Sequence, residues 1–231
     1  INGVDVRELS NGYAVLNVKK ELIDEVANVE EITYIEKPTA LIFSLLRGKQ
    51  ASCINEVQQT FANNENNGLF GEGVIVGIAD SGIDFTHEAF RNQDGTTRIL
   101  NLWDQTNDRV YNAEEINEAL KSENPYESVN SVDYSGHGTH VAGIAAGNFA
   151  ENKNDNLGIA TKSSLVIVKM ALAGERSFPR TTQLMEAVDY MIKVAESYKM
   201  PLAMNLSFGN SYGSHDGTSL LSTYLDSMAD G

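Results

Sequence analysis

The sequence has a single cysteine, Cys53, among its 231 residues. An intramolecular disulfide is therefore excluded, and stability must come from packing or from bound ligands. The sequence also lacks any run approaching the roughly 20 apolar residues that a membrane-spanning helix needs, and no signal-peptide pattern opens it. Positive charge is scarce, because 17 Lys and Arg stand against 32 Asp and Glu, for a net charge of −15. Such a surface repels phosphate backbones and argues against nucleic-acid binding.

What is present is the composition of an ordinary folded protein with a sizeable core, at 42% hydrophobic and 21% charged residues. The lone Cys53 has no His-rich or Gly-rich surroundings in the sequence. A buried structural thiol is therefore favoured over a nucleophile.

The first 50 residues are predicted to form a small α+β unit. Alternation over residues 12–18 and again over 31–36 predicts two strands, and helical spacing over 20–28 predicts a helix between them. A unit of this size buries little surface by itself, so we expect it to pack on something larger.

Residues 51–231 have the pattern of an α/β domain. Three apolar runs predict buried parallel strands: 74–79, 165–172 and 202–208. Helical patterns cover 137–146, 182–198 and 221–228. Strands that alternate with helices predict a parallel sheet with helices on both faces, in which functional residues gather at the carboxyl ends of the strands. Residues 91–133 are polar around a strand-like piece at 98–103 and are interpreted as an insertion.

Two segments carry residues suited to catalysis. Asp80 follows the first apolar run, and His137 opens a helical segment rich in small residues. A histidine can take the proton of a serine nucleophile, and a buried carboxylate can hold that histidine in the correct tautomer. Two other interpretations stay open: Asp80 as a turn or helix-cap residue, and His137 with His140 as half of a zinc site. Gly138 stands where the H-E-x-x-H zinc motif has Glu, which argues against zinc.

Together, these segments resemble the subtilisin-like serine proteases (subtilases, peptidase S8 type). The matching pieces follow the family's order: 78–84, 135–147, 156–160, 165–172 and 205–209. By this resemblance, Asp80 is the catalytic aspartate, His137 is the catalytic histidine, and His140 is a structural neighbour. Ser207, Phe208 and Gly209 would line the substrate cleft and pair with an extended peptide. The resemblance implies a serine endopeptidase whose partner is a protein or peptide substrate and which uses no cofactor.

The resemblance also implies a role for residues 1–50, because subtilases are made with a propeptide that assists folding and inhibits the enzyme. Cleavage would fall between residues 39 and 51, with 48–50 as a candidate junction, while a simple N-terminal subdomain is the alternative. The insertion and the segment 210–230 look most like spore-germination proteases of the Csp type. That likeness implies a secreted, spore-associated or cell-envelope protein.

The family pattern is incomplete in this sequence. Subtilases carry their nucleophile in Gly-Thr-Ser-Met-Ala-x-Pro or close to it, whereas Gly217–Ser219 is followed by Leu220 and lacks the Ala and Pro. Ser219 opens an amphipathic segment, so a helix cap is the simpler interpretation. We therefore expect the nucleophilic serine to lie beyond residue 231 or on a second polypeptide, and these 231 residues alone to be inactive. A pseudoprotease that binds a partner is the alternative function.

Two further site types are disfavoured. Many subtilases bind calcium through an acid nine residues after the catalytic aspartate, where this sequence has Ala89. The Asn-rich loop 152–156 is then interpreted as a solvated turn, and no metal is expected. Nucleotide binding is disfavoured because Gly71 and Gly73 precede their strand, and no G-x-G-x-x-G opens a helix.

Overall fold

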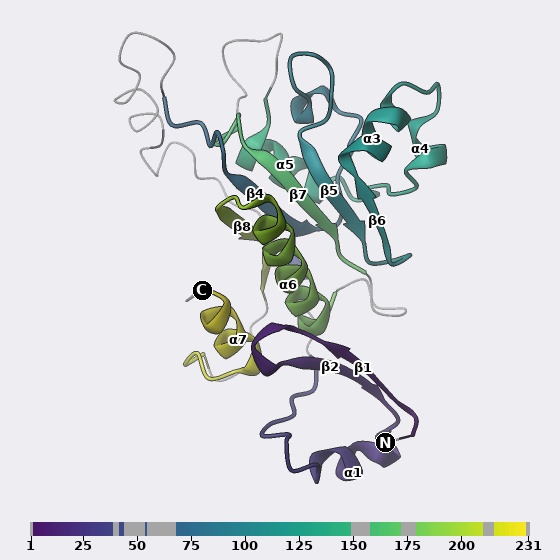
Figure 1. Cartoon of the computed structure of the whole chain (residues 1–231), viewed down its shortest axis with the longest axis vertical. Helices are drawn as coiled ribbons and strands as arrows, with labels where there is room; N and C mark the ends of the chain where they lie inside the picture. The colour runs from purple at the N-terminus through teal and green to yellow at the C-terminus, as the bar shows by residue number, and fades with distance from the viewer. Residues whose placement is uncertain are drawn as a thin grey trace.

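The main domain is built on a five-stranded sheet. The computed structural model of the protein describes residues 2–38, 42–43, 54, 68–148, 158–171, 179–209 and 215–229. The strands lie in the order β6-β5-β7-β4-β8 (Figure 1). Their bounds are β4 Ile75–Asp80, β5 Ile99–Asp104, β6 Arg109–Asn112, β7 Ser164–Lys169 and β8 Leu202–Leu206. β5, β7, β4 and β8 are parallel, and β6 pairs antiparallel with β5 at one edge.

Helices cover both faces of this sheet, as predicted. Successive side chains of a strand point to opposite faces, so Ile78 and Ile167 enter one buried cluster while Ala79 and Val168 enter another. The first cluster includes residues of α5 (His137–Ala146) and α3 (Ala113–Leu120), and the second includes residues of α6 (Thr181–Tyr198). The continuous apolar runs of β4 and β7 arise because both faces of these strands are buried.

The segment interpreted as an insertion is partly integral to the sheet. Residues 91–133 contribute β5, β6, α3 and the short helix α4 (Pro125–Ser128). β5 lies between β6 and β7, so it completes the core rather than standing outside it. The antiparallel edge strand β6 is an addition to the predicted parallel sheet.

The N-terminal unit is a two-stranded hairpin followed by short helical turns. β1 (Val4–Glu8) pairs antiparallel with β2 (Ala14–Val18) through the turn η1 (Ser10–Gly12). The predicted helix appears as η2 (Lys20–Leu22) and α1 (Ile23–Ala27). The predicted strand 31–36 is wrong, because this segment pairs with no described strand. Its apolar side chains Tyr34 and Ile35 are 61% and 40% exposed, so the alternation of this segment does not bury one face.

The N-terminal unit packs on α6 and on α7 (Leu220–Ala229), where the hairpin and α7 are drawn together in Figure 1. Leu9 is buried in a cluster with Val188 of α6 and Tyr224 of α7, and the ring of Tyr13 lies edge-on to Tyr224 at 4.9 Å. The expectation that this small unit packs on a larger body is thus confirmed. No helix in the described part of the chain is both long enough and apolar enough to span a membrane, and Cys53 lies outside the described residues.

Candidate active site

Asp80 is the last residue of β4 and is completely buried. Its Oδ1 accepts hydrogen bonds from the backbone N–H of Ser81 at 2.7 Å and from the ring of His137 at 2.7 Å. Oδ2 is buried with no hydrogen-bond partner among the described residues. Burial raises the pKa of the Asp80 carboxyl, and the bonds from His137 and Ser81 offset only part of that rise.

His137 is the first residue of α5, at the end of the helix that faces Asp80. Gly136 precedes it with φ 70°, a left-handed conformation that glycine adopts without a steric cost. Gly138 follows it and lies so close to the end of β4 that an added Cβ would overlap the carbonyl oxygen of Gly82 and stand 3.1 Å from the Cβ of Asp80. The small residues noted in the sequence therefore let α5 approach the sheet and bring Nδ1 of His137 to Asp80.

A second carboxylate, which the sequence analysis did not single out, fastens the start of α5. Asp133 Oδ1 accepts from Ser81 Oγ at 2.8 Å and from the Gly136 N–H at 3.0 Å. Its Oδ2 accepts from both the N–H and the Oγ of Thr139, at 2.9 and 2.7 Å. Burial alone would raise the pKa of Asp133, but the bonds from Thr139, Ser81 and Gly136 outweigh it and lower that pKa. Asp133 is therefore held as a carboxylate that joins the helix to the end of β4.

Ser81 completes this connection. The N–H of Gly138 donates to Ser81 Oγ at 2.9 Å, while the backbone of Ser81 donates to Asp80. Ser81 is thus bonded to Asp80 through its backbone and to the first turn of α5 through its side chain. No residue spacing in the sequence identified Ser81 and Asp133 as partners, since they stand 52 residues apart.

The segment 91–133 also contacts the neighbourhood of Asp80. Tyr126 of α4 donates its hydroxyl to Asp84 Oδ1 at 2.8 Å, and its ring lies edge-on to Phe85 at 5.0 Å. Burial, together with the bond to Asp84, raises the pKa of Tyr126 to about 12, so its hydroxyl stays a donor at neutral pH. The predicted insertion therefore supports the turn that follows Asp80.

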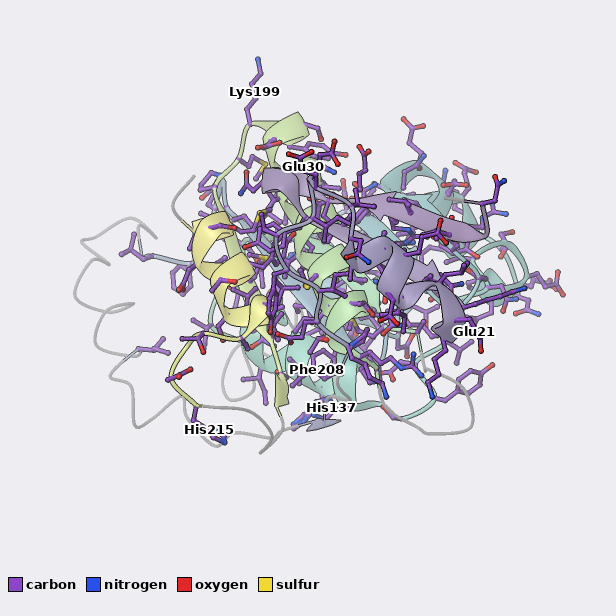
Figure 2. The ribbon with its side chains drawn as sticks, turned by 90° about the horizontal axis from the view of Figure 1, so that it is seen from below. Glu21, Glu30, His137, Lys199, Phe208 and His215 are labelled. Atoms are coloured by element: carbon purple, nitrogen blue, oxygen red, sulfur yellow. The ribbon has the colours of Figure 1, made fainter. Side chains whose placement is uncertain are left out.

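The predicted substrate-contacting residues lie just after β8. Asn205 Nδ2 donates to Ser207 Oγ at 2.6 Å, and Phe208–Gly209 form a short strand, β9. This strand pairs antiparallel with β3 (Ile42–Phe43), with Phe43 opposite Phe208. Figure 2 labels Phe208 and His137 toward the same side of the molecule. A segment of the chain itself therefore occupies the pairing edge of β9.

The remaining candidates are placed as follows. Ser219 Oγ accepts from the N–H of Ser222 at 3.2 Å in the first turn of α7, which confirms the predicted helix cap. Figure 1 shows α7 well separated from α5, with α6 between them. His140 is exposed, and no group of three or more His, Cys, Asp or Glu suited to a metal occurs among the described residues. The candidate junction 48–50 and the loop 152–156 lie outside them.

Comparisons with known proteins agree with this arrangement. The Subtilase family model (Peptidase S8) matches residues 71–229, and the Csp protease B prodomain model matches residues 2–39. The solved structure of the CspB protease of Clostridium perfringens is 44% identical, with a TM-score of 0.70, over 79% of this chain and 38% of that one.

Curated relatives are more distant. The major intracellular serine protease of Bacillus subtilis (strain 168) is 29% identical over 54% of this chain and 32% of its own length. Subtilisin-like protease 5 of Arthroderma gypseum is 26% identical over 92% of this chain and 47% of its own length. The chain thus spans between about a third and a half of the length of these relatives. With 159 of its 231 residues (71–229) matched by the family model and the aspartate–histidine geometry in place, the chain belongs to the subtilase family.

Proposed function

We propose that the chain supplies the aspartate and histidine of a serine endopeptidase, with Asp80 as the orienting carboxylate and His137 as the general base. The single observation that carries this proposal is the 2.7 Å contact between His137 Nδ1 and the buried Oδ1 of Asp80. When Nδ1–H donates to the carboxylate, the lone pair of the neutral ring resides on Nε2. Nε2 is the atom that takes the proton of a serine hydroxyl in this chemistry.

The reaction then follows the acyl-transfer scheme. His137 accepts the proton as serine attacks the scissile carbonyl, and Asp80 stabilises the imidazolium that forms. His137 returns the proton to the leaving amine, and the same pair activates the water that hydrolyses the acyl-enzyme. The burial of Asp80 strengthens its interaction with the imidazolium, because the local dielectric constant is low.

The nucleophilic serine is proposed to lie outside residues 1–231. Ser219 is engaged with Ser222 as a cap of α7 and is not followed by the Ala and Pro of the family motif. The chain also spans under half the length of the relatives described above. Residues 51–231 are accordingly proposed as the first part of the catalytic domain.

Residues 1–50 are proposed to act as an inhibitory propeptide, with Ser207–Gly209 as the strand that binds extended peptides. The pairing of β3 with β9 supports both assignments, because residues 42–43 belong to the proposed propeptide and occupy the edge of β9 that a substrate strand would use. The Csp protease B prodomain match over residues 2–39 supports the same assignment.

The test is intact-mass spectrometry before and after treatment with a fluorophosphonate probe, with His137→Ala as the control. We expect the 25.2 kDa chain to stay unlabelled. A longer form, or a companion polypeptide bound to this chain, should gain one probe mass, and His137→Ala should abolish that gain. Labelling of the 25.2 kDa chain itself would contradict the proposed place of the serine. Absence of label on every form would contradict the protease and favour a binding pseudoprotease.

A further inference from the structure

Arg98 is a charged residue in the hydrophobic core. It directly precedes β5, is only 6% exposed, and forms no ion pair with any described residue. A buried charge without a counter-charge is costly unless hydrogen bonds satisfy it. Burial lowers the pKa of Arg98 to about 10, so the guanidinium remains charged at neutral pH.

Four backbone carbonyls surround this guanidinium. Nη1 donates to Ala146 O at 2.7 Å and to Ala89 O at 3.2 Å. Nε and Nη2 both donate to Ser163 O, at 3.0 and 2.9 Å, and Nη2 also reaches Ala160 O at 3.2 Å. The planar guanidinium of arginine has five N–H donors and can bond to all four carbonyls. The ammonium group of lysine has three donors and a different geometry.

These carbonyls belong to the segments that carry the candidate site. Ala146 is the last residue of α5, the helix that begins with His137. Ala89 lies in the turn η3 (Glu88–Phe90), downstream of Asp80, and Ser163 directly precedes β7. The positive charge of Arg98 also stands at the carboxyl end of α5, where the helix dipole favours a cation.

The helix α5 is thereby held at both ends. Its first turn is fixed by the bonds of Asp133 and Ser81 and by the close approach of Gly138. Its last residue lies about 14 Å along the helix from His137, at 1.5 Å per residue. The last turn is fixed by Arg98 and by the N–H of Ala160, which donates to Ala145 O at 2.8 Å. A rigid helix anchored only at its first turn could tilt, and a tilt would move the ring that it presents.

We propose that Arg98 is a positioning residue, which anchors the last turn of α5 so that His137, at the first turn, stays in hydrogen-bond contact with Asp80. The inference rests on the proposed function in one respect: His137 is taken as the base whose orientation matters. Arg98 touches neither Asp80 nor His137 and acts through the helix.

The test uses the 231-residue chain labelled with ¹⁵N-histidine, and compares Arg98→Lys and Arg98→Met with the matched control Arg109→Met. Arg109 is 57% exposed in its side chain and pairs only with Glu115 among the described acids. The readout is the solvent exchange rate of the His137 Nδ1 proton, measured by NMR well below the thermal midpoint of each variant.

We expect exchange of that proton to rise about tenfold or more in Arg98→Met, because the unpaired carbonyls release the last turn. Arg98→Lys should give a smaller rise and Arg109→Met none. The thermal midpoint of Arg98→Met should also fall, by about 5 °C or more.

Two outcomes would overturn the positioning role. Folded Arg98 variants with an unchanged Nδ1 proton would show that Arg98 stabilises the core without orienting His137. Failure of both Arg98 variants to fold would assign the residue to global stability. Neither outcome depends on turnover, so a failure here differs from a failure of the protease assignment, which the fluorophosphonate labelling alone decides.

Discussion

At the scale of single residues, the candidate site depends on the closeness of one helix to one strand. Gly138 has no side chain, and a Cβ added there would meet the backbone of Gly82 and the Cβ of Asp80. Asp133 receives five hydrogen bonds from donors around it, and three of them come from Gly136 and Thr139, at the start of α5. A methyl group or a lost acceptor here changes the distance between Asp80 and His137.

Gly138→Ala should destabilise the protein by about 1–3 kcal/mol, because its methyl group would overlap the backbone of Gly82. Urea unfolding measures the effect. Gly143→Ala, in the same helix, is the matched control, since an added Cβ at Gly143 meets nothing within 4 Å. That control should be neutral or gain up to about 1 kcal/mol of helix propensity. Equal effects at the two positions would contradict the close approach.

Asp133→Asn should cost about 1–3 kcal/mol, because an amide has one acceptor oxygen where the carboxylate has two, and its NH₂ must face existing donors. Thermal or urea unfolding tests this. Asp94→Asn is the control, because Asp94 also accepts from the N–H and Oγ of one threonine, Thr96, but in an exposed turn. If Asp133→Asn left the free energy of unfolding unchanged, the Asp133 carboxylate would not be what holds the first turn of α5.

At the scale of elements, the N-terminal unit contacts the main domain at the first residue of the helix α7. Glu36 Oε2 accepts from the N–H of Leu220, the first residue of α7, at 2.9 Å. The first N–H groups of a helix lack partners within the helix, and a carboxylate there also complements the helix dipole. A residue of the predicted propeptide therefore caps a helix of the predicted catalytic domain.

Glu36→Ala should loosen α7 and the N-terminal unit together, at a cost of about 1 kcal/mol. Native-state hydrogen exchange should show faster exchange in both α7 and β1–β2, with β4 and β7 unchanged. Glu31→Ala is the control, since Glu31 is exposed in the same segment. Faster exchange confined to α7 would mean that the cap does not help hold the N-terminal unit.

At the scale of the whole molecule, charged groups sit between the N-terminal unit and α6. Asp189 accepts from the N–H of Ser10 at 2.9 Å and from Lys193 Nζ at 2.6 Å. Burial would raise the pKa of Asp189, but the bonds from Lys193 and Ser10 outweigh it and lower that pKa. Glu186 faces Arg7 at 3.2 Å, and burial raises its pKa.

These shifts predict how acid affects docking. A lowered pKa means that the contribution of Asp189 is complete above its ordinary value of 3.8 and is lost as the pH falls through the lowered value. The raised pKa of Glu186 acts in the opposite direction, because the folded state holds that proton more tightly. Protection of the Ser10 amide should therefore fall below about pH 4 in the wild type. In Asp189→Asn, the protection of the Ser10 amide should be lower at neutral pH and should decrease less on acidification. Identical pH profiles would contradict this role of Asp189.

Local patterns predicted much of the fold. The helix 137–146 was predicted with the bounds that α5 has, because small apolar residues ended by Gly147 define it locally. β4 and β7 could be predicted because a strand that is buried on both faces consists of a continuous run of apolar residues. The strand 31–36 was wrong, since alternation specifies a strand only where a neighbouring strand offers hydrogen bonds.

The family resemblance, the alternating α/β order and the candidates Asp80 and His137 could be predicted from the amino-acid sequence, because each depends on a short contiguous segment. The bonds of Asp133 to Ser81, the carbonyl set around Arg98 and the pairing of β3 with β9 became evident only in the folded structure. Apart from the Arg98–Ala89 bond, which spans 9 positions, these contacts join residues from 48 to more than 160 positions apart. The physical reason is that such hydrogen bonds depend on how the sheet and helices pack, which no local pattern of residues encodes.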